Sequence, residues 1–497
     1  MQREAVCLSL LLCPDADVYA VLRAFKEGRQ QNGEKEMIHK FSMHGANIVL
    51  DVNSGAVHVV DDLAYEILDE LEKPDEEIEE KFSVKYGRAE TSEALSELRK
   101  LQAAGLLMSE DILEEYLAEN PISSEGEPVV KALCLHVAHD CNLRCRYCFA
   151  STGDFGTGRS LMPVSVAKKA IDFLIEKSGP RRNLEVDFFG GEPLLNFDTV
   201  RETVLYALER EKETGKRFRF TLTTNAVLLN EEHKEFINKY MGNVVLSLDG
   251  RPETNDRMRF RANGRGTYSD IVPKIKDMAE SRGQDNYYVR GTFTRENLDF
   301  SKDVLHLADL GFKQVSVEPV VAAKDSGFDL RHEDLPVLFR EYEDLAMEYV
   351  RRYREGRGFN FFHFMIDLDQ GPCLIKRMKG CGSGHEYLAV TPEGDLYPCH
   401  QFTGMERFKL GNVNNGFDID TSVSNMFIKR NIYTKPECRK CWAKFFCSGG
   451  CAANDWQFSN CLDKPYDIGC ELERKRVECA LWIKAAESDM DQADHEV

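Results

Sequence analysis

The stretch Cys141-Asn142-Leu143-Arg144-Cys145-Arg146-Tyr147-Cys148 places three cysteines on one short segment with C-x3-C-x2-C spacing. It closely follows an apolar run, residues 132–137, that predicts a buried strand. Three thiolates on one loop can hold three irons of a [4Fe–4S] cube and leave the fourth iron open, whereas a closed structural zinc site normally has four protein ligands. Zinc completed by His139 or Cys134, or plain reduced core cysteines, are the alternatives that the spacing leaves open.

The region around this loop alternates strand and helix patterns. Candidate strands cover residues 132–137, 184–189, 218–224, 244–248, 287–294 and 314–320, with amphipathic helices between most of them, for example at 164–177, 198–212 and 300–310. Six such units predict a parallel α/β sheet that is buried on both faces. Right-handed crossovers would make it a doubly wound sheet or a partial barrel, and in either form ligands bind at the carboxyl ends of the strands.

Glycine-rich and polar segments follow several of these strands. Gly190-Gly191-Glu192-Pro193 comes after the second strand, Thr223-Thr224-Asn225 after the third, and Ser247-Leu248-Asp249-Gly250 after the fourth, with Asp256-Arg257-Met258-Arg259 close behind. Two glycines let the backbone approach a small charged ligand closely. A glycine pair alone more often marks a turn, but together with the cysteine loop these segments predict a shared ligand site.

With an aromatic residue just before its last cysteine, the array resembles that of the radical S-adenosylmethionine (SAM) superfamily, and residues 190–193 resemble its GGEP motif. The resemblance implies a [4Fe–4S] cluster whose open iron chelates SAM, and a reduced cluster that cleaves SAM into methionine and a hydrogen-abstracting 5′-deoxyadenosyl radical. It implies that Cys141, Cys145 and Cys148 hold the cluster and that Gly190, Gly191 and Glu192 contact the SAM amino group. It also implies that Ser247 and Arg259 contact the SAM carboxylate and, less securely, that Glu318 contacts the ribose.

A second cysteine field fills the C-terminal part of the chain. Of the 16 cysteines, ten lie between Cys373 and Cys479. A disulfide scaffold would be small and would follow a signal peptide, which this chain lacks in convincing form. Soft thiolate ligands select zinc or iron–sulfur clusters, so the field predicts metal ligation.

Its spacing resembles the SPASM extension of peptide-modifying radical SAM enzymes, with the zinc-ribbon-like knot as the alternative. The resemblance implies two auxiliary [4Fe–4S] clusters, three clusters in all. One would be held by Cys438, Cys441, Cys447 and Cys470. The other, nearer the active site, would be held by Cys381, Cys399 and Cys451, with Cys373 as candidate fourth ligand or with an open iron that binds a substrate thiol.

The N-terminal part predicts a separate small module. Strands are expected at residues 38–43, 46–52 and 56–60 and helices at 63–71, 76–86 and 91–104, which suits a winged-helix-like module or a plain structural appendage. The expected organisation is an extension at 1–36 with Met37 as possible natural start, the module at 37–108, a linker at 109–131, the core at 132–360 and the cysteine-rich domain at 361–497.

Taken with the core, this module resembles the PqqD-like elements that capture leader peptides by adding them as a strand, here near residues 37–43. Residues 37–52 and 381–388 look like those of maturases of six-cysteine (SCIFF) peptides. This implies a thioether cross-link from a Cys sulfur to a Thr carbon of a Cys-rich precursor, and a flavodoxin- or ferredoxin-type one-electron reductant. The alternatives are another peptide-modifying SPASM enzyme, such as an anaerobic sulfatase-maturating enzyme, and a non-catalytic iron–sulfur electron carrier or zinc scaffold.

Charge and hydropathy argue against two classes of partner. The net charge of −20 disfavours a broad nucleic-acid or anionic-membrane surface. No apolar run approaches the roughly 20 residues that span a bilayer. The apolar stretch at residues 5–13 is short and lacks an Ala-x-Ala cleavage site, so we expect a cytoplasmic protein.

Overall fold

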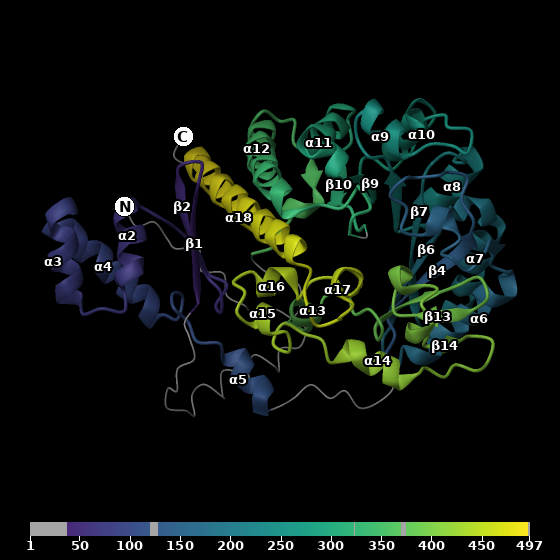
Figure 1. Cartoon of the computed structure of the whole chain (residues 1–497), viewed down its shortest axis with the longest axis horizontal. Coiled ribbons are helices and arrows are strands. Elements are labelled where there is room, and N and C mark those ends of the chain that lie inside the picture. Colours follow the sequence, from purple (N-terminus) through teal and green to yellow (C-terminus); the bar gives the residue numbers. More distant parts are fainter. Residues whose placement is uncertain (1–36, 120–127, 323, 369–373, 496–497) are drawn as a thin grey trace.

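The computed structural model describes residues 37–119, 128–322, 324–368 and 374–495. The predicted extension at 1–36 and Cys373 therefore lie outside the described residues. Figure 1 shows a small N-terminal unit at one end of the molecule, an α/β sheet at the other, and helix α18 (Asp467–His495) between them.

The N-terminal unit contains the three strands that the sequence predicts. Strands β1 (Ile38–Met43), β2 (Ala46–Asp51) and β3 (Val57–Val60) form an antiparallel sheet in the order β1-β2-β3. Helices α2 (Asp62–Ile67), α3 (Asp75–Tyr86) and α4 (Arg88–Ala103) follow, with the 3-10 turn η1 (Leu68–Glu70) after the first. One face of the sheet shares a small core with these helices, whereas the other contributes Phe41 and Leu50 to the main core.

The stretch predicted as a linker, residues 109–131, contains helix α5 (Ile112–Glu119). Leu113 packs against Met378 and Ile432 of the cysteine-rich part. Asp111 accepts hydrogen bonds from Lys444 Nζ at 2.6 Å and from the Tyr433 hydroxyl at 2.9 Å. The acidic residue Asp111 thus has specific partners, and residues 109–119 of the predicted linker are docked on the C-terminal domain.

Six parallel strands follow one another in the central sheet in chain order. They are β4 (Ala132–His139), β6 (Asn183–Gly190), β7 (Arg217–Thr224), β8 (Asn243–Ser247), β9 (Tyr287–Phe293) and β10 (Gln314–Pro319). Each begins and ends within two residues of its predicted bounds. A doubly wound sheet reverses its strand order at a switch point, whereas the order of these six strands is not reversed. Right-handed crossovers therefore place all the connecting helices on the same side of the sheet. This order favours the partial barrel over the doubly wound alternative.

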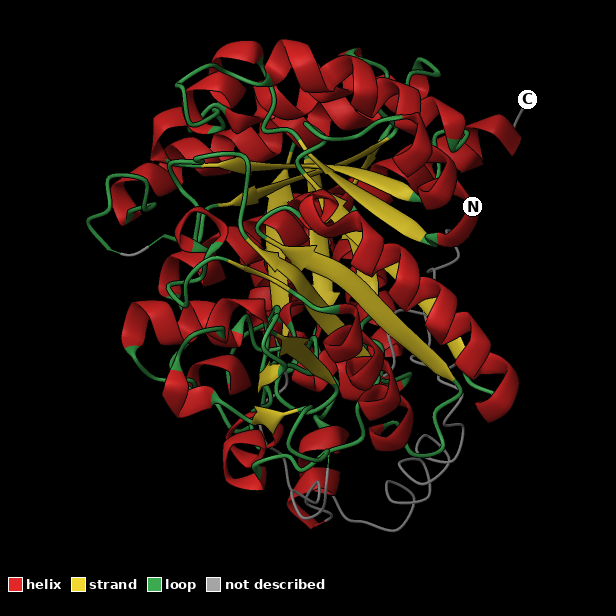
Figure 2. Cartoon of the chain, turned by 90° about the vertical axis from the view of Figure 1, so that its right-hand side faces the viewer, coloured by secondary structure: helices red, strands yellow, loops and turns green. Residues whose placement is uncertain are grey.

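Helices cover the outside of this sheet, as Figure 2 shows. They are α6 (Val164–Lys177), α7 (Phe197–Thr214), α8 (Glu231–Tyr240), α9 (Pro252–Met258), α10 (Tyr268–Ser281), α11 (Phe300–Asp309) and α12 (Leu335–Arg354). In α6, Val166, Ala170 and Phe173 lie on one buried stripe at helical spacing. Amphipathic periodicity therefore explains why these segments form helices on the sheet.

The C-terminal part extends the same sheet, which the sequence did not predict. Strand β11 (Asn360–Phe361) pairs with β10, and β12 (Tyr387–Val390) pairs in parallel with β4. Strands β13 (Asp395–Tyr397) and β14 (Gly411–Asn412) continue antiparallel from β12, and β5 (Ser160–Leu161) pairs with the end of β4. The strand that leads to the three-cysteine loop is thus also the attachment point of the cysteine-rich part.

Short helices separated by loops follow in the cysteine-rich part of the chain. They are α13 (Leu374–Lys379), α14 (Thr421–Ile428), α15 (Pro436–Arg439), α16 (Lys444–Cys447) and α17 (Ala452–Ser459). The further 3-10 turns are η2 (Ser151–Gly153), η3 (Pro193–Asn196), η4 (Arg295–Asn297), η5 (His332–Asp334), η6 (Phe362–Phe364), η7 (His400–Phe402) and η8 (Glu406–Phe408). Helix α18 packs against α12 and η6. Within the described ranges, no helix combines the length and apolar character that a membrane span needs.

Candidate active site

The three-cysteine loop is held against the segment that carries Arg259. The backbone N–H of Arg144 donates to the carbonyl of Phe260 at 2.8 Å, and that of Arg146 donates to the carbonyl of Met258 at 3.0 Å. Two segments far apart in the sequence are thereby joined backbone to backbone. The cysteines and Arg259 therefore face a common space.

That space is a cavity at the carboxyl ends of the parallel strands. Its lining includes every residue that the sequence assigned to the radical SAM site: Cys141, Cys145, Cys148, Gly190, Gly191, Glu192, Ser247, Arg259 and Glu318. Burial is the main cause that raises the pKa of Cys141 to about 12 and that of Cys145 to about 11. Without a metal these thiols are neutral, so loading a cluster would release protons.

The paired glycines are required by the protein's own backbone. A Cβ atom at Gly191 would lie 2.2 Å from the Asp140 carbonyl oxygen, and one at Gly190, where φ is +126°, would lie 2.3 Å from the Ala138 carbonyl oxygen. The sequence attributed these glycines to close approach of a ligand. The structure adds that they let the end of β6 lie against the segment leading into the cysteine loop.

Glu192 is fully buried and its carboxylate is used within the fold. It accepts hydrogen bonds from Thr224 Oγ1 at 2.7 Å and from the backbone N–H of Asn225 at 2.8 Å. Burial raises the pKa of this carboxyl although these donors oppose the effect. Asn225 in turn donates to Asn142 Oδ1 at 2.8 Å, so Glu192 ties β6 to β7 and supports the cysteine loop.

Arg259 keeps an unused donor inside the protein. Its Nη1 donates to the Tyr147 hydroxyl at 2.9 Å, and that hydroxyl donates to Asp249 Oδ2 at 2.7 Å. Burial raises the pKa of Asp249 to about 6, against the opposing effects of Arg259 and Tyr147. The buried Nε of Arg259 has no hydrogen-bond partner among the described residues. A desolvated guanidinium with a free N–H suits a carboxylate ligand, so these residues fit the amino-acid end of SAM.

Glu318, predicted at the ribose, is paired with Arg290. Its two carboxylate oxygens lie 2.8 Å from Arg290 Nε and 2.6 Å from Arg290 Nη2. Burial would raise the pKa of Glu318, but Arg290 outweighs it and holds the pKa at about 2. Both side chains line the cavity, as does His400, whose buried Nδ1 has no partner among the described residues. The sequence assigned no role to Arg290.

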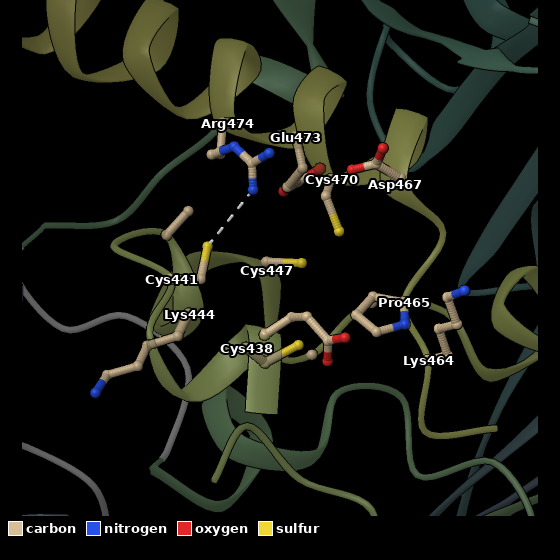
Figure 3. A pocket seen from close by; sticks show the side chains of 14 residues that line it. Cys438, Cys441, Lys444, Cys447, Lys464, Pro465, Asp467, Cys470, Glu473 and Arg474 are labelled. Atoms are coloured by element: carbon tan, nitrogen blue, oxygen red, sulfur yellow. Dashed lines mark hydrogen bonds between the residues drawn. The ribbon is translucent and has the colours of Figure 1, made fainter. Parts of the chain in front are cut away.

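A second cavity is lined by the four cysteines predicted to hold one auxiliary cluster: Cys438, Cys441, Cys447 and Cys470. Figure 3 shows their sulfur atoms around its interior, contributed by α15, α16, α18 and the turn between the first two. Arg474 Nη1 lies 4.0 Å from Cys441 Sγ. In the part of the chain that the structure describes, no three His, Cys, Asp or Glu side chains converge closely enough to hold one bare metal ion. Four thiols around a cavity fit the four-cysteine ligation of an iron–sulfur cluster.

Three further cysteines of the second field, Cys381, Cys399 and Cys451, are also neighbours. The pKa of Cys399 is raised first by burial and then by nearby Cys451 and Cys381. Their candidate fourth ligand, Cys373, lies outside the described residues. The structure thus brings together three of the four predicted thiols and leaves the identity of the fourth ligand a prediction.

A buried ion cluster, missed by the sequence analysis, holds these cysteine segments together. Asp455 Oδ2 lies 2.5 Å from Lys435 Nζ and 2.7 Å from Arg430 Nη2, and Lys435 Nζ also donates to the Gly449 carbonyl at 2.7 Å. The backbone N–H of Tyr466 donates to Asp455 Oδ1 at 3.1 Å. One carboxylate therefore connects the segments that lead to Cys438, Cys451 and Cys470. No spacing in the sequence signals this arrangement.

Comparison with known proteins supports the two-part organisation. The model of the radical SAM superfamily matches residues 135–304, and that of the SPASM iron–sulfur cluster-binding domain matches residues 381–442. A cysteine-type anaerobic sulfatase-maturating enzyme of Clostridium novyi is 24% identical over 332 residues, 63% of this chain and 86% of that protein. The radical SAM cyclopropyl synthase TigE of Paramaledivibacter caminithermalis is 23% identical over 347 residues, 65% of this chain and 68% of that protein. The structure of anSMEcpe with bound AdoMet has a TM-score of 0.60 at 19% identity and covers 72% of this chain and 99% of its own.

The chain therefore contains a radical SAM domain and a SPASM domain, as the resemblance of its motifs implied. Its cofactors are SAM and a [4Fe–4S] cluster in the first domain and auxiliary iron–sulfur clusters in the second. Both matched ranges lie C-terminal to the three-stranded unit, whose role as a peptide-recognition module stays a prediction.

Proposed function

We propose that this chain is a peptide maturase that joins a Cys sulfur to a Thr carbon in a Cys-rich, SCIFF-type precursor. The observation that carries the proposal is the single cavity that gathers the three-cysteine loop, the free guanidinium N–H of Arg259 and the polar side chains of His400 and Gln401. Relatives named as sulfatase maturases and a cyclopropyl synthase support a peptide or protein substrate. The SCIFF subtype rests on the resemblance of residues 37–52 and 381–388.

The residues that line the cavity are proposed to bind the cluster and SAM in separate roles. Cys141, Cys145 and Cys148 hold the cluster, and Ser247 and Arg259 hold the SAM carboxylate. When bound, the cluster and SAM supply a one-electron cleavage that yields a hydrogen-abstracting 5′-deoxyadenosyl radical. The apolar part of the lining, which includes Phe149, Val320 and Val321, excludes water from the reacting centre.

The N-terminal unit is proposed to bind the leader of the precursor. Strand β1 is an edge of the three-stranded sheet, and an edge strand can accept a peptide as a further strand. His39 on β1 stacks on Trp442 with ring centroids 3.6 Å apart, and its Nε2 lies 3.0 Å from Glu478 Oε1 on α18. Since Trp442 follows Cys441, a peptide on this edge would lie near the cysteine-rich domain. The flavodoxin- or ferredoxin-type reductant and the cytoplasmic location stay predictions.

The test is anaerobic incubation of the reconstituted protein with SAM, a reductant and a Cys-rich precursor peptide. We expect the mass of the peptide to fall by two hydrogens for each cross-link. The number of thiols that react with an alkylating reagent should fall by one for each cross-link. A matched precursor in which alanine replaces the threonines should stay unmodified. A thiol converted to an aldehyde that hydrazine derivatises would instead support the sulfatase-maturase alternative and refute the thioether.

A further inference from the structure

A line of hydrogen bonds joins the two cavities through residues that no motif identifies. Glu318 lines the first cavity and Glu473 lines the cysteine cavity, where Figure 3 shows it close to Cys470. Between them, the Ser316 hydroxyl lies 3.4 Å from Glu318 Oε1 and 3.4 Å from His363 Nε2. Arg476 Nη1 lies 2.9 Å from His363 Nδ1, and Arg476 Nη2 donates to Glu473. We call Ser316, His363 and Arg476 the bridge.

From Arg476 to Glu318, the donors of the bridge point the same way. A guanidinium only donates, so the bond from Arg476 makes His363 Nδ1 an acceptor and leaves the ring proton on Nε2. His363 Nε2 then donates to Ser316, whose hydroxyl donates to Glu318. Because a guanidinium does not release its proton, the bridge cannot conduct protons from one cavity to the other. It can relay the electrostatic effect of a charge, because the hydrogen bonds of a chain polarise one another.

The charges of both cavities act on the bridge. The pKa of Arg476 is raised, since Glu473, Tyr342, Glu318 and Cys447 together outweigh the effect of burial. Its Nε is buried without a hydrogen-bond partner in the described ranges. This cation therefore lies within the field of a cluster ligand on one side and of the SAM-cavity carboxylate on the other. Such partly buried charges are screened by salt less than exposed ones.

We propose that His363 and Arg476 are positioning residues that couple the charge of the cluster in the cysteine cavity to the charge state of the SAM cavity. The inference rests on the cluster assignment of the proposed function but not on its peptide substrate. Coupling between sites is reciprocal, so a change of charge beside SAM must shift the reduction potential of the auxiliary cluster. A negative charge removed from the SAM cavity should make that cluster easier to reduce.

The experiment measures the midpoint potential of the auxiliary cluster by EPR-monitored redox titration of the reconstituted full chain, without SAM or peptide. The relevant signal is the one that Cys447→Ala removes. We expect Glu318→Gln to favour reduction by about fivefold, which corresponds to about 41 mV at 59 mV per tenfold for one electron. The same change should have little effect when made together with Arg476→Gln or His363→Phe.

Lys475→Gln is the matched control, because it removes one positive charge from the same turn of α18. Lys475 pairs with Glu343 and Glu478 and takes no part in the bridge. The Glu318→Gln shift should persist in this background. Arg476→Lys keeps the positive charge but not the paired hydrogen bonds to His363 and Glu473, so it should reduce the Glu318→Gln shift of the potential. This variant replaces Arg476→Gln in the test if Arg476→Gln does not fold.

Three results would overturn the proposal. An equal Glu318→Gln shift in every background would show coupling that does not use the bridge, and no shift in the unaltered background would show no coupling. A chain that loads no cluster in the cysteine cavity would refute both this inference and the cluster assignment. A failure of cross-linking alone would leave these potentials readable, because no peptide is used.

Discussion

The Tyr147 hydroxyl, from the three-cysteine loop, donates a hydrogen bond of 2.7 Å to the buried carboxylate of Asp249 at the end of β8. The same hydroxyl accepts a hydrogen bond from Arg259. The loop expected to hold the cluster and the arginine expected to hold the SAM carboxylate are therefore connected through one phenol. This relation makes the orientation of Arg259 depend on Tyr147.

Tyr147→Phe should weaken SAM binding about tenfold, because it removes hydrogen bonds to two charged groups. The measurement is the dissociation constant of SAM for the oxidised, reconstituted protein, by calorimetry. Tyr206→Phe is the control, since Tyr206 also donates to a carboxylate, Asp172, at 2.8 Å, but on the outer helices. Equal SAM affinity in both variants would contradict the role of Tyr147.

Asp455→Asn should destabilise the protein by about 3–5 kcal/mol, because it leaves the cations of Lys435 and Arg430 buried without their carboxylate. Urea unfolding checks the free energy of unfolding, and iron analysis checks whether auxiliary clusters are lost. Asp463→Asn is the control, since Asp463 is exposed and 3.9 Å from Arg430, and its effect should stay within about 0.5 kcal/mol. A stable Asp455→Asn protein with full iron content would refute the structural role of Asp455.

Gly191→Ala should disturb the radical SAM cluster, because the added Cβ would overlap the Asp140 carbonyl next to Cys141. We expect the EPR signal of that cluster to be lost or altered, and SAM cleavage to be abolished. Gly283→Ala adds the same methyl group at φ +62° with nothing within 4 Å, so it should cost about 1–2 kcal/mol and leave the cluster intact. Normal SAM cleavage by Gly191→Ala would show that the close contact is not needed.

Cys470→Ala should remove one auxiliary cluster and lower the iron content from about twelve to about eight per chain, if three [4Fe–4S] clusters are present. Iron analysis and EPR check this, and reductive SAM cleavage should remain. Cys461→Ala is the control, because Cys461 is exposed and lines neither cavity. A full complement of iron in Cys470→Ala would remove Cys470 from the ligand set.

The parallel core and the three-cysteine loop could be predicted because their signals are local. Alternating strand and helix periodicity fixed the six core strands, and the fixed spacing around Cys141 identified the loop. The short strand β12 could not be predicted, because four residues carry no distinctive period and its partner β4 lies far away in the sequence. Helix α5 was not predicted, because the acidic composition of the stretch is typical of a linker and gives no sign of the packing of Leu113 against Met378 and Ile432.

The charged pairs around the site were equally invisible in the sequence. Arg290 and Glu318 lie on neighbouring strands and meet only once the register of β9 and β10 is known. His363 and Arg476 come from η6 and α18, which tertiary packing brings together. Such pairs depend on the fold and on no spacing, so a sequence can suggest the residues but not the contact.

Cys141, Cys145 and Cys148 are proposed to hold a cluster that binds and cleaves SAM. The most direct test compares the anaerobically reconstituted chain with its Cys141→Ala/Cys145→Ala/Cys148→Ala variant for 5′-deoxyadenosine formation under reduction, alongside iron content and EPR. We predict that the variant loses about four irons, keeps its auxiliary cluster signals and forms no 5′-deoxyadenosine. Undiminished 5′-deoxyadenosine formation by the variant, or an unaltered chain that contains only zinc, would contradict the claim.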